Sequence, residues 1–434
     1  MIENKSDVIV IGGGLAGCVA ADTAAKAGKK VTMLFQTGGS TEVSGGALDV
    51  CGVIPGEKPA VVENYADGIA ELVKAYPAHV YGKCADAVAP AVAAAMKLAE
   101  DGGFKMTAYD GKNVWVPNMM GTFSVNAAVS EMMADGAVVP GEAEKVLVIG
   151  IKGNVSFNAQ AAAMSYKQYQ KKLGGKADYY STVIKLNGWG DRRKISDGEL
   201  ADYLDTEDGI RELTEAILTF CRNNRYNFDK MLLPPALGFI NYSKNLKTLK
   251  EACGCKIAEI ECLGNAVVGY RMTRAMYKAL RAEGVKLIRG SVAKALKADD
   301  NGVSVEAVVG LTDQLHPGKT MTFTADKAIL ATGGFLGGGI VARHTKVWIN
   351  LLEEELGLVT PEMLDRNPVA GAGQDVLRLG ASVNSDMTVV NGGFAGRVYA
   401  CGELLAGQNT ASERSGSGVA AATAYTAAVN AAKN

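Results

Sequence analysis

The first part of the chain consists of short apolar runs separated by a segment of small residues. Val8 to Ile11 is a β-branched apolar run, which is typical of a strand buried in a parallel sheet. The small residues of Cys18 to Ala27 predict a helix, which Gly28 ends. Lys30 to Phe35 then predicts a second strand. The chain therefore opens with a strand–helix–strand unit, from which parallel sheets are built.

Apolar runs and helical segments continue to alternate beyond this unit. Helices are predicted at Lys83 to Glu100, Phe157 to Lys172, Asp208 to Arg222 and Val268 to Glu283. Strands are predicted at Lys145 to Ile151, Tyr179 to Leu186 and Lys230 to Leu233. This alternation of strands with helices indicates an α/β fold with parallel sheets.

The last third of the chain predicts antiparallel strands as well. Lys286 to Leu296 and Val303 to Val309 are separated by the turn-prone segment Asp299-Asp-Asn-Gly302 and predict a hairpin. Thr320 to Ala325 extends the hairpin into a three-stranded meander. Two short buried strands are predicted at Lys327 to Gly334, where the strand ends in Ala-Thr-Gly-Gly, and at Arg397 to Cys401, and a final alanine-rich helix is predicted at Ser415 to Ala432.

The length of the chain, 434 residues, is too great for a single compact core, so we expect two or three domains. The pattern of the opening stops near Pro55 and resumes near Gly264. The residues between these points have strands and helices of their own. We therefore predict a Rossmann-like domain made of residues 1–54 plus 265–434, with an inserted α/β cap domain over residues 55–264.

Charge and composition exclude several classes of function. The 45 basic and 46 acidic side chains nearly cancel, which leaves no basic footprint for nucleic acid. No apolar run approaches the ~18 residues of a membrane-spanning helix, and no leader precedes the first strand. Eight cysteines without a secretory signal indicate reduced thiols and a cytoplasmic protein. With three histidines and only Cys253-Gly-Cys255 clustered, we predict no metal site.

A glycine turn, Gly12-x-Gly14-x-x-Gly17, joins the first strand to the first helix, where the dinucleotide fingerprint stands. Gly12 permits the tight turn, Gly14 lets the backbone approach a pyrophosphate, and Gly17 lets the helix pack on the strand. The first helical turn adds N–H groups and the positive end of a dipole. We predict that a pyrophosphate binds to Gly12, Gly13, Gly14, Leu15, Ala16 and Gly17.

The residue after the second strand departs from the usual pattern. An acidic residue often stands there and accepts hydrogen bonds from ribose hydroxyls, whereas this chain has Gln36. A neutral amide can still bond to a ribose. The identity of the nucleotide is therefore open at this point.

Later segments rich in glycine, serine and threonine complete the candidate site. The segment Ser415 to Val419 opens the last helix with glycines. The positive end of the helix dipole at such a start favours a group that becomes negative, such as the N1–C2=O edge of a reduced flavin. Glu403, after a buried strand, can accept a hydrogen bond from a hydroxylated chain. We predict further cofactor contacts from Gln36, Ser40, Thr41, Ser44, Gly45, Gly46, Ala331, Thr332, Gly333, Gly402, Glu403, Gly416, Ser417, Gly418 and Val419.

The order of these motifs resembles that of the two-dinucleotide-binding-domain flavoproteins, and the inserted domain resembles the fumarate reductase branch of that superfamily. A narrower resemblance covers nearly the whole chain. It is to the B subunit of the anaerobic glycerol-3-phosphate dehydrogenase. The segments that carry it are Ser44 to Asp49, Val148 to Ile151 with Phe157, Leu233 to Gly238, Ala331 to Ala342 and Gly416 to Tyr425.

The resemblance implies a flavoprotein subunit that oxidises sn-glycerol 3-phosphate to dihydroxyacetone phosphate, or relays the electrons, in anaerobic respiration and glycerol metabolism. Its partners would be a second flavoprotein subunit and an iron–sulfur, membrane-associated subunit that passes electrons to quinone. The chain would be cytoplasmic and peripheral to the inner membrane through these partners. Family descriptions give FMN, but the complete glycine turn argues for a pyrophosphate, so we predict non-covalent FAD with FMN as the alternative.

Substrate oxidation within this chain would need a base for the hydroxyl proton and cations for the phosphate. The candidates are Arg343 and His344, after the glycine loop, and Arg414, before the last helix. Two alternatives stay open. One is a stand-alone fumarate reductase-type enzyme that reduces a 2-enoate, and the other is a non-catalytic scaffold that holds flavin.

Overall fold

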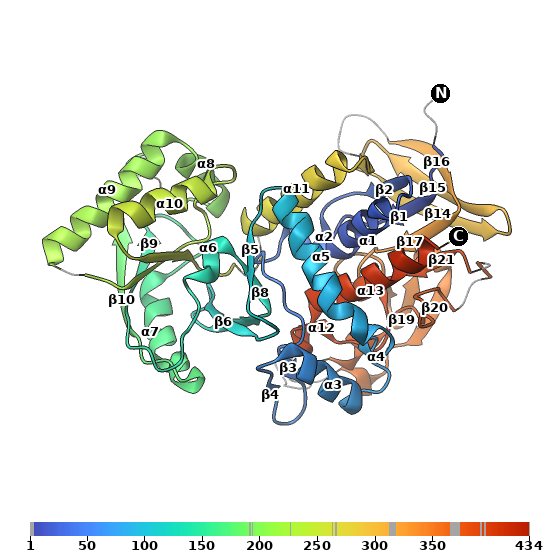
Figure 1. Ribbon diagram of the computed structural model, residues 1–434, viewed down its shortest axis with the longest axis horizontal. Helices are drawn as coiled ribbons and strands as arrows, with labels where there is room; N and C mark the ends of the chain where they lie inside the picture. Colours follow the sequence, from blue (N-terminus) through green and yellow to red (C-terminus); the bar gives the residue numbers. More distant parts are fainter. Residues whose placement is uncertain are drawn as a thin grey trace. The chain divides into compact units, whose positions relative to one another are not determined.

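The computed structural model describes residues 4–190, 192, 194–225, 227–262, 264, 267–311, 318–364, 374–390, 393–394 and 396–433. The chain divides into two compact units, each with its own strands and helices (Figure 1). Residues 1–42, 48–104 and 273–434 make the first unit, and residues 43–47 and 105–272 make the second. Each unit contains a parallel sheet, which confirms the α/β fold class.

The first unit is built on a parallel sheet in the order β13-β2-β1-β17-β21. β1 (Val8–Ile11) is central and lies between β2 (Val31–Phe35) and β17 (Lys327–Leu330). β13 (Lys286–Arg289) and β21 (Val398–Ala400) are the outer strands. Every side chain of β1 and β2 is buried, as expected for central parallel strands.

Helices with short side chains pack beside this sheet. α1 (Leu15–Lys26) lies along α13 (Gly416–Ala431), and α5 (Val88–Asp101) packs against both (Figure 1). Their contact faces are rich in alanine, and side chains this small let neighbouring helices approach closely. α13 is largely buried and has no charged side chain.

The three-stranded meander is confirmed by antiparallel pairing of β14 (Val292–Asp299), β15 (Gly302–Val309) and β16 (Lys319–Ala325). The prediction of one continuous strand from Lys286 to Leu296 is wrong. Gly290 takes a φ of 73° and divides this segment, so that β13 joins the parallel sheet beside β2 and β14 begins the meander.

The boundaries of the units differ from the predicted cap domain over residues 55–264. Residues 48–104 belong to the first unit, because α5 packs on α1 and α13. The end of α5 lies so close to Ala275 that a Cβ on Gly102 would be 1.9 Å from the carbonyl oxygen of Ala275. The second unit covers residues 105–272 and takes in residues 43–47, whereas the predicted domains are residues 1–54 plus 265–434 and residues 55–264.

The second unit has a parallel sheet in the order β10-β9-β11-β12. β9 (Lys145–Ile151) lies between β10 (Asp178–Ile184) and β11 (Lys230–Leu233), and all three confirm predicted strands. β12 (Lys256–Glu259) pairs with β11 and was not predicted, because its short run contains only two apolar residues.

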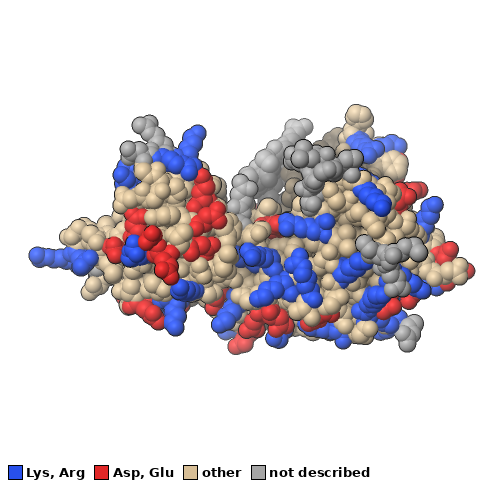
Figure 2. Space-filling model, turned by 90° about the horizontal axis from the view of Figure 1, so that it is seen from above, with Lys and Arg blue, Asp and Glu red and all other residues tan. Residues whose placement is uncertain are grey.

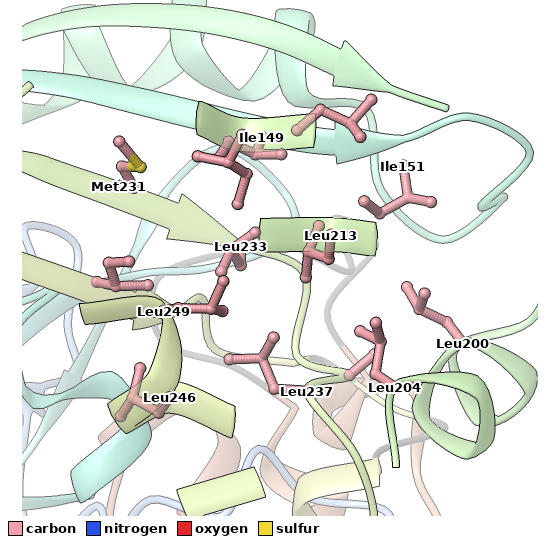
Figure 3. Packing of buried hydrophobic residues seen from close by; sticks show 14 of the residues in the cluster. Ile149, Ile151, Leu200, Leu204, Leu213, Met231, Leu233, Leu237, Leu246 and Leu249 are labelled. Carbon is pink, nitrogen blue, oxygen red and sulfur yellow. The ribbon is translucent and has the colours of Figure 1, made fainter. Parts of the chain in front are cut away.

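Side chains of β9 alternate between two cores on opposite faces of this sheet. Ile149 packs with Leu213 and Leu249 on one face (Figure 3), and Val148 lies in the other core with Ala162. The helices on the first face are α8 (Asp197–Leu204), α9 (Glu207–Asn224) and α10 (Tyr242–Cys253), and α7 (Ala159–Tyr169) covers the second.

Charged side chains of both signs lie on the face that Figure 2 shows, in keeping with their nearly equal numbers. None of the helices in the described part of the chain combines the length and apolarity that crossing a membrane requires. The described residues also contain no group of three His, Cys, Asp or Glu side chains that could hold a metal ion.

The core of the second unit can be tested with two isoleucines. Ile149 is completely buried, whereas Ile240 is 67% exposed. Ile149→Ala should lower the free energy of unfolding by about 2–5 kcal/mol, because it leaves a cavity. Ile240→Ala, the matched control, should change it by only about 0.5 kcal/mol. Urea denaturation of both variants measures this difference, and equal losses would contradict the assignment of the core.

Candidate cofactor site

The glycine turn after β1 is shaped by the protein's own packing. A Cβ on Gly12 would lie 2.0 Å from the carbonyl oxygen of Ala331, and the φ of Gly12 is 131°. A Cβ on Gly17 would lie 2.1 Å from the carbonyl oxygen of Gly12. Both glycines are therefore required for β1, α1 and the end of β17 to meet at one place.

Gly14 differs from these two glycines. Its φ is −77°, which any residue can adopt, and its nearest neighbour to an added Cβ would be the Thr41 hydroxyl at 3.4 Å. The protein itself therefore leaves room for a side chain at this position. Gly14 lies at the start of α1 in ordinary contact range of Thr41 and Gly38, and the helix dipole favours a phosphate group at such a helix start.

Side chains from other elements hold the turn, and the contact that Tyr277 makes was not predicted. The Tyr277 hydroxyl of α11 (Val267–Ala282) donates to the carbonyl oxygen of Gly13 at 2.7 Å, and its ring lies 4.8 Å from that of Phe35. Burial raises the pKa of Tyr277, so the phenol stays protonated and keeps donating. The N–H of Leu15 donates to the Thr41 hydroxyl at 2.8 Å. The N–H of Leu15, at the start of α1, therefore already has a hydrogen-bond acceptor within the protein.

The segment after β2 is more exposed than the turn. Gln36 and Ser40 are both exposed. Glu42 accepts a hydrogen bond from the N–H of Gly38 at 2.7 Å and lies 3.6 Å from the Arg289 guanidinium. The Glu42 carboxylate thus stabilises the loop. Gln36 stays the predicted contact to the ribose.

The ends of β17 and β21 lie next to each other. The N–H of Cys401 donates to the carbonyl oxygen of Leu330 at 2.9 Å, so Ala331, Thr332 and Gly333 continue beside Gly402 and Glu403. Glu403 is partly buried, and its Oε1 accepts a hydrogen bond from the Thr410 hydroxyl at 3.3 Å. The structure therefore brings three predicted segments to the carboxyl edge of the first sheet.

The start of α13 has a partner that the sequence did not reveal. Asp49 Oδ1 accepts the N–H of Ser417 at 2.8 Å, and the carbonyl oxygen of Asp49 accepts the N–H of Gly418 at 2.8 Å. Two of the donors that were predicted to face a flavin carbonyl are thus bound by one aspartate.

The predicted contacts Ser44, Gly45 and Gly46 lie in the second unit. A Cβ on Gly45 would be 2.6 Å from Cγ of Glu261, and the N–H of Gly46 donates to the Ser44 hydroxyl at 3.2 Å. Their grouping with the segments of the first unit stays a prediction.

The three predicted catalytic side chains are exposed. Arg343 ends β18 (Val341–Arg343), and His344 follows it with a φ of 54° in the turn to β19 (Lys346–Ile349). Arg414 is also exposed and has a φ of 52° after α12 (Thr410–Glu413). Their catalytic roles stay predictions.

The most polar buried cluster of the first unit surrounds Glu413, which is fully buried. Its carboxylate accepts hydrogen bonds from the Ser415 hydroxyl at 3.0 Å and the N–H of Asn409 at 2.9 Å. It also lies 3.1 Å from Nε2 of buried His79 and 2.9 Å from Nη1 of Arg378. Burial alone would raise the pKa of Glu413, but these partners bring it below its ordinary value.

A family model described as an FAD binding domain matches residues 7–177 of the chain, which include β1 and the glycine turn. The chain is therefore an FAD-binding flavoprotein, as the turn and the order of its motifs predict.

Curated proteins named as the B subunit of anaerobic glycerol-3-phosphate dehydrogenase match nearly the full length. The protein from Actinobacillus pleuropneumoniae is 26% identical over 451 residues, which cover 97% of this chain and 98% of that protein. The protein from Pectobacterium atrosepticum is 23% identical over 434 residues, which cover 96% of each. These full-length matches confirm the resemblance seen in the sequence.

The described residues fit FAD better at one end of the site than at the other. At the pyrophosphate end, the absence of a side chain at Gly14 and the start of α1 suit a diphosphate. At the start of α13, the Asp49 carboxylate stands where a free positive helix end was expected. The start of α1 therefore agrees with a family that binds FAD. The start of α13 departs from the prediction of a free helix end.

The role of Gly14 can be separated from that of Gly12. Gly14→Ala should fold normally, because its methyl group meets only ordinary contacts, but it should weaken FAD binding by about tenfold or more by filling the diphosphate space. Gly12→Ala, the comparison variant, should fail to fold, because its Cβ would overlap Ala331. Melting temperatures of the FAD-free chains and flavin fluorescence titrations measure both effects. Unchanged FAD affinity in Gly14→Ala would contradict the assignment.

The Glu413 cluster predicts a pH dependence of stability. Because the pKa of folded Glu413 is below its ordinary value, its contribution is present at neutral pH and is lost as the pH falls through that lowered pKa. Glu413→Gln should lower the free energy of unfolding at pH 7 by about 3 kcal/mol. It should also remove part of the loss of stability in acid.

Asp375→Asn is the matched control for Glu413→Gln. Asp375 also pairs with Arg378, at 3.4 Å, but its side chain is 65% exposed. Its removal should cost less than about 1 kcal/mol. Chemical denaturation at several pH values compares the two variants, and equal costs at pH 7 would rule out a dominant role for Glu413.

Proposed function

We propose that this chain is the FAD-binding B subunit of an anaerobic glycerol-3-phosphate dehydrogenase complex. The complex would oxidise sn-glycerol 3-phosphate to dihydroxyacetone phosphate and pass the electrons to quinone. The observation that carries the proposal is the match to proteins of that name over nearly the full length of the chain. The glycine at position 14, which the packing of the protein itself does not require, supports it independently.

The reaction of the complex balances without a further reactant. Oxidation of the substrate's secondary alcohol to a ketone releases two electrons and two protons, and quinone takes up both as quinol. FAD, when bound, supplies the capacity to accept two electrons and give them up again. In this chain, the start of α1 would hold the diphosphate. Thr410 donates a hydrogen bond to Oε1 of Glu403, and the Glu403 carboxylate would be the acceptor for the hydroxylated chain of FAD.

We favour a role as an electron relay. Arg343 at the end of β18 is exposed, and so are His344 and Arg414 on turns, whereas a base and phosphate-binding cations must close around a substrate. The substrate would then be oxidised at the second flavoprotein subunit, and this chain would pass the electrons to the iron–sulfur, membrane-associated subunit. The chain itself would be cytoplasmic and attached to the membrane only through that partner.

The proposal is tested in the assembled complex with Gly14→Val in this chain. The wild-type complex should reduce a soluble quinone analogue with sn-glycerol 3-phosphate, and this chain should release FAD on extraction. The variant complex should lose the FAD of this chain and nearly all quinone reduction. Reduction of a dye at the second flavoprotein subunit should continue. Arg343→Ala should leave all of these activities unchanged.

Other outcomes identify the alternatives. Extraction of FMN would overturn the FAD assignment. Unchanged quinone reduction in a complex in which this chain lacks flavin would favour a non-catalytic scaffold. Reduction of a 2-enoate by the isolated chain with a reduced dye, lost in Arg343→Ala, would favour a fumarate reductase-type enzyme.

A further inference from the structure

An outer strand of the second unit has an open edge. Among the described strands, β10 pairs only with β9, and it lies on the outside of the sheet β10-β9-β11-β12 (Figure 1). Val183 of this strand is 61% exposed and Tyr180 is 39% exposed. A strand edge with exposed apolar side chains is a template for pairing with another strand.

The hydrogen bonds of β10 show which of its backbone groups face outward. The N–H of Asp178 donates to the carbonyl oxygen of Glu144 at 2.7 Å. The carbonyl oxygen of Ile184 accepts the N–H of Lys152 at 2.8 Å. The even-numbered residues of β10 thus bond to β9, because the residues that bond to one neighbour alternate along a parallel strand. The outward N–H and C=O groups therefore belong to Tyr179, Ser181 and Val183.

Other long edge strands of the protein are protected against such pairing. β14 carries Lys294 and Lys297, and its pairing with β15 shifts in register. β16 is covered near the N-terminus of the chain, where the N–H of Ser6 donates to the carbonyl oxygen of Thr324 at 3.0 Å. Lysines, register shifts and covering segments all prevent edges from meeting. In β10, the stretch from residue 179 to residue 183 contains no lysine, no proline and no register shift, which indicates a partner strand.

The order of side chains along β10 matches its own reverse. Tyr179 and Tyr180 precede Ser181, and the β-branched Thr182 and Val183 follow it. In an antiparallel pair of two such strands centred on Ser181, Tyr179 lies opposite Val183 of the second copy, and Tyr180 lies opposite its Thr182. Aromatic and β-branched residues form favourable cross-strand pairs, and no like charges meet in this arrangement.

The same centre also satisfies the backbone. Residues that face each other across a two-fold axis at Ser181 have numbers of the same parity, so outward groups lie opposite outward groups, as ladder hydrogen bonds require. A centre between two residues would set outward groups opposite groups that already bond to β9. The side chains and the backbone therefore favour one register.

A helix beside β10 adds apolar surface to this edge. α7 packs against β10, and Lys167 of α7 pairs with Asp178 at 3.2 Å. Met164 lies one turn before Lys167, on the same side of α7, and is 66% exposed. The face of α7 that carries Met164 thus borders β10, and a chain paired with β10 can cover it.

We propose that β10 pairs with β10 of a second copy of this chain, antiparallel and centred on Ser181, so that the protein forms a two-fold symmetric dimer. Such a contact is closed, because each edge meets an identical edge and none is left over. The inference needs no cofactor, substrate or companion subunit, since every residue that carries it lies in the second unit.

The mass of the full chain in solution tests the dimer. Interfaces below about 1,200 Å² form reversible complexes, so the average mass should rise towards twice that of one chain between about 1 and 100 µM. Val183→Lys places a charge on the open edge and should leave the chain monomeric over this range. Val155→Lys is the matched control and should dimerise like the wild type, because Val155 is 64% exposed in the same unit but lies outside β10. Sedimentation equilibrium measures the masses, and both variants should keep the wild-type melting temperature.

A single introduced cysteine tests the register. Ser181→Cys would place two thiols opposite each other, with their Cα atoms about 5.5 Å apart, which a disulfide spans. Oxidised glutathione takes up the two electrons and two protons as reduced glutathione, so this variant should become a covalent dimer. Val183→Cys is also exposed, but its two copies would lie about 13 Å apart along the strands and should not cross-link. The wild-type chain, whose eight cysteines are buried or partly buried, should not cross-link either.

A mass of one chain at every concentration would overturn the inference. Dimerisation of Val183→Lys as strong as that of the wild type, or a dimer that Ser181→Cys does not cross-link, would also overturn it, because another surface would then hold the copies together. In the assembled complex, a cross-link from Ser181→Cys to a companion subunit would give the edge a different partner and would count against a second copy. None of these measurements uses quinone reduction, so a failure of the proposed function is distinguishable from a failure of this inference.

Discussion

The close approach of Ala331 to residue 12 is the constraint on which the first unit depends. The carbonyl oxygen of Ala331 lies where a side chain on residue 12 would have to be, and the start of α1 packs just as tightly through Gly17. These contacts bring the end of β17 against the first turn of the chain, and β21 follows beside β17. A single sheet edge can therefore combine segments from both ends of the sequence. Extended cofactors bind at such edges, beyond the carboxyl ends of parallel strands.

The sequence predicted most of the elements, because these depend on local patterns. The strand–helix–strand opening, the meander and the strands of the second unit follow from runs of apolar residues and from turn residues between them. The place of residues 55–104 could not be predicted in the same way. The alanines of α5 indicate that its neighbours lie close, but they do not say that those neighbours are α1 and α13. Likewise, Gly290 indicates that the predicted strand from Lys286 to Leu296 is interrupted. It does not indicate which sheet β13 and β14 each join.

The cofactor site was predictable where spacing alone defines it, as in the three glycines of the turn. Contacts between distant residues were not. Asp49 stands 368 positions from Ser417, and nothing in the sequence around it indicates a helix start as its partner. Glu413 did leave a signal, since it is the only acidic residue after Glu403. A single carboxylate in such a small and apolar segment indicates a buried group with dedicated partners. Thr41 was predicted to contact the cofactor, and in the structure its hydroxyl accepts a hydrogen bond from the N–H of Leu15.

The link between His79 and Glu413 has a consequence for how the chain folds as it is synthesised. The two residues are buried together although 334 positions separate them. The second unit, apart from residues 43–47, is complete once residue 272 has been made. The first unit must wait for β17, β21 and α13, so β1 and its helix leave the ribosome long before their neighbours. Apolar strands that wait in this way attract chaperones and are prone to aggregate, which makes the late closure of the first unit the vulnerable step in the biogenesis of this protein.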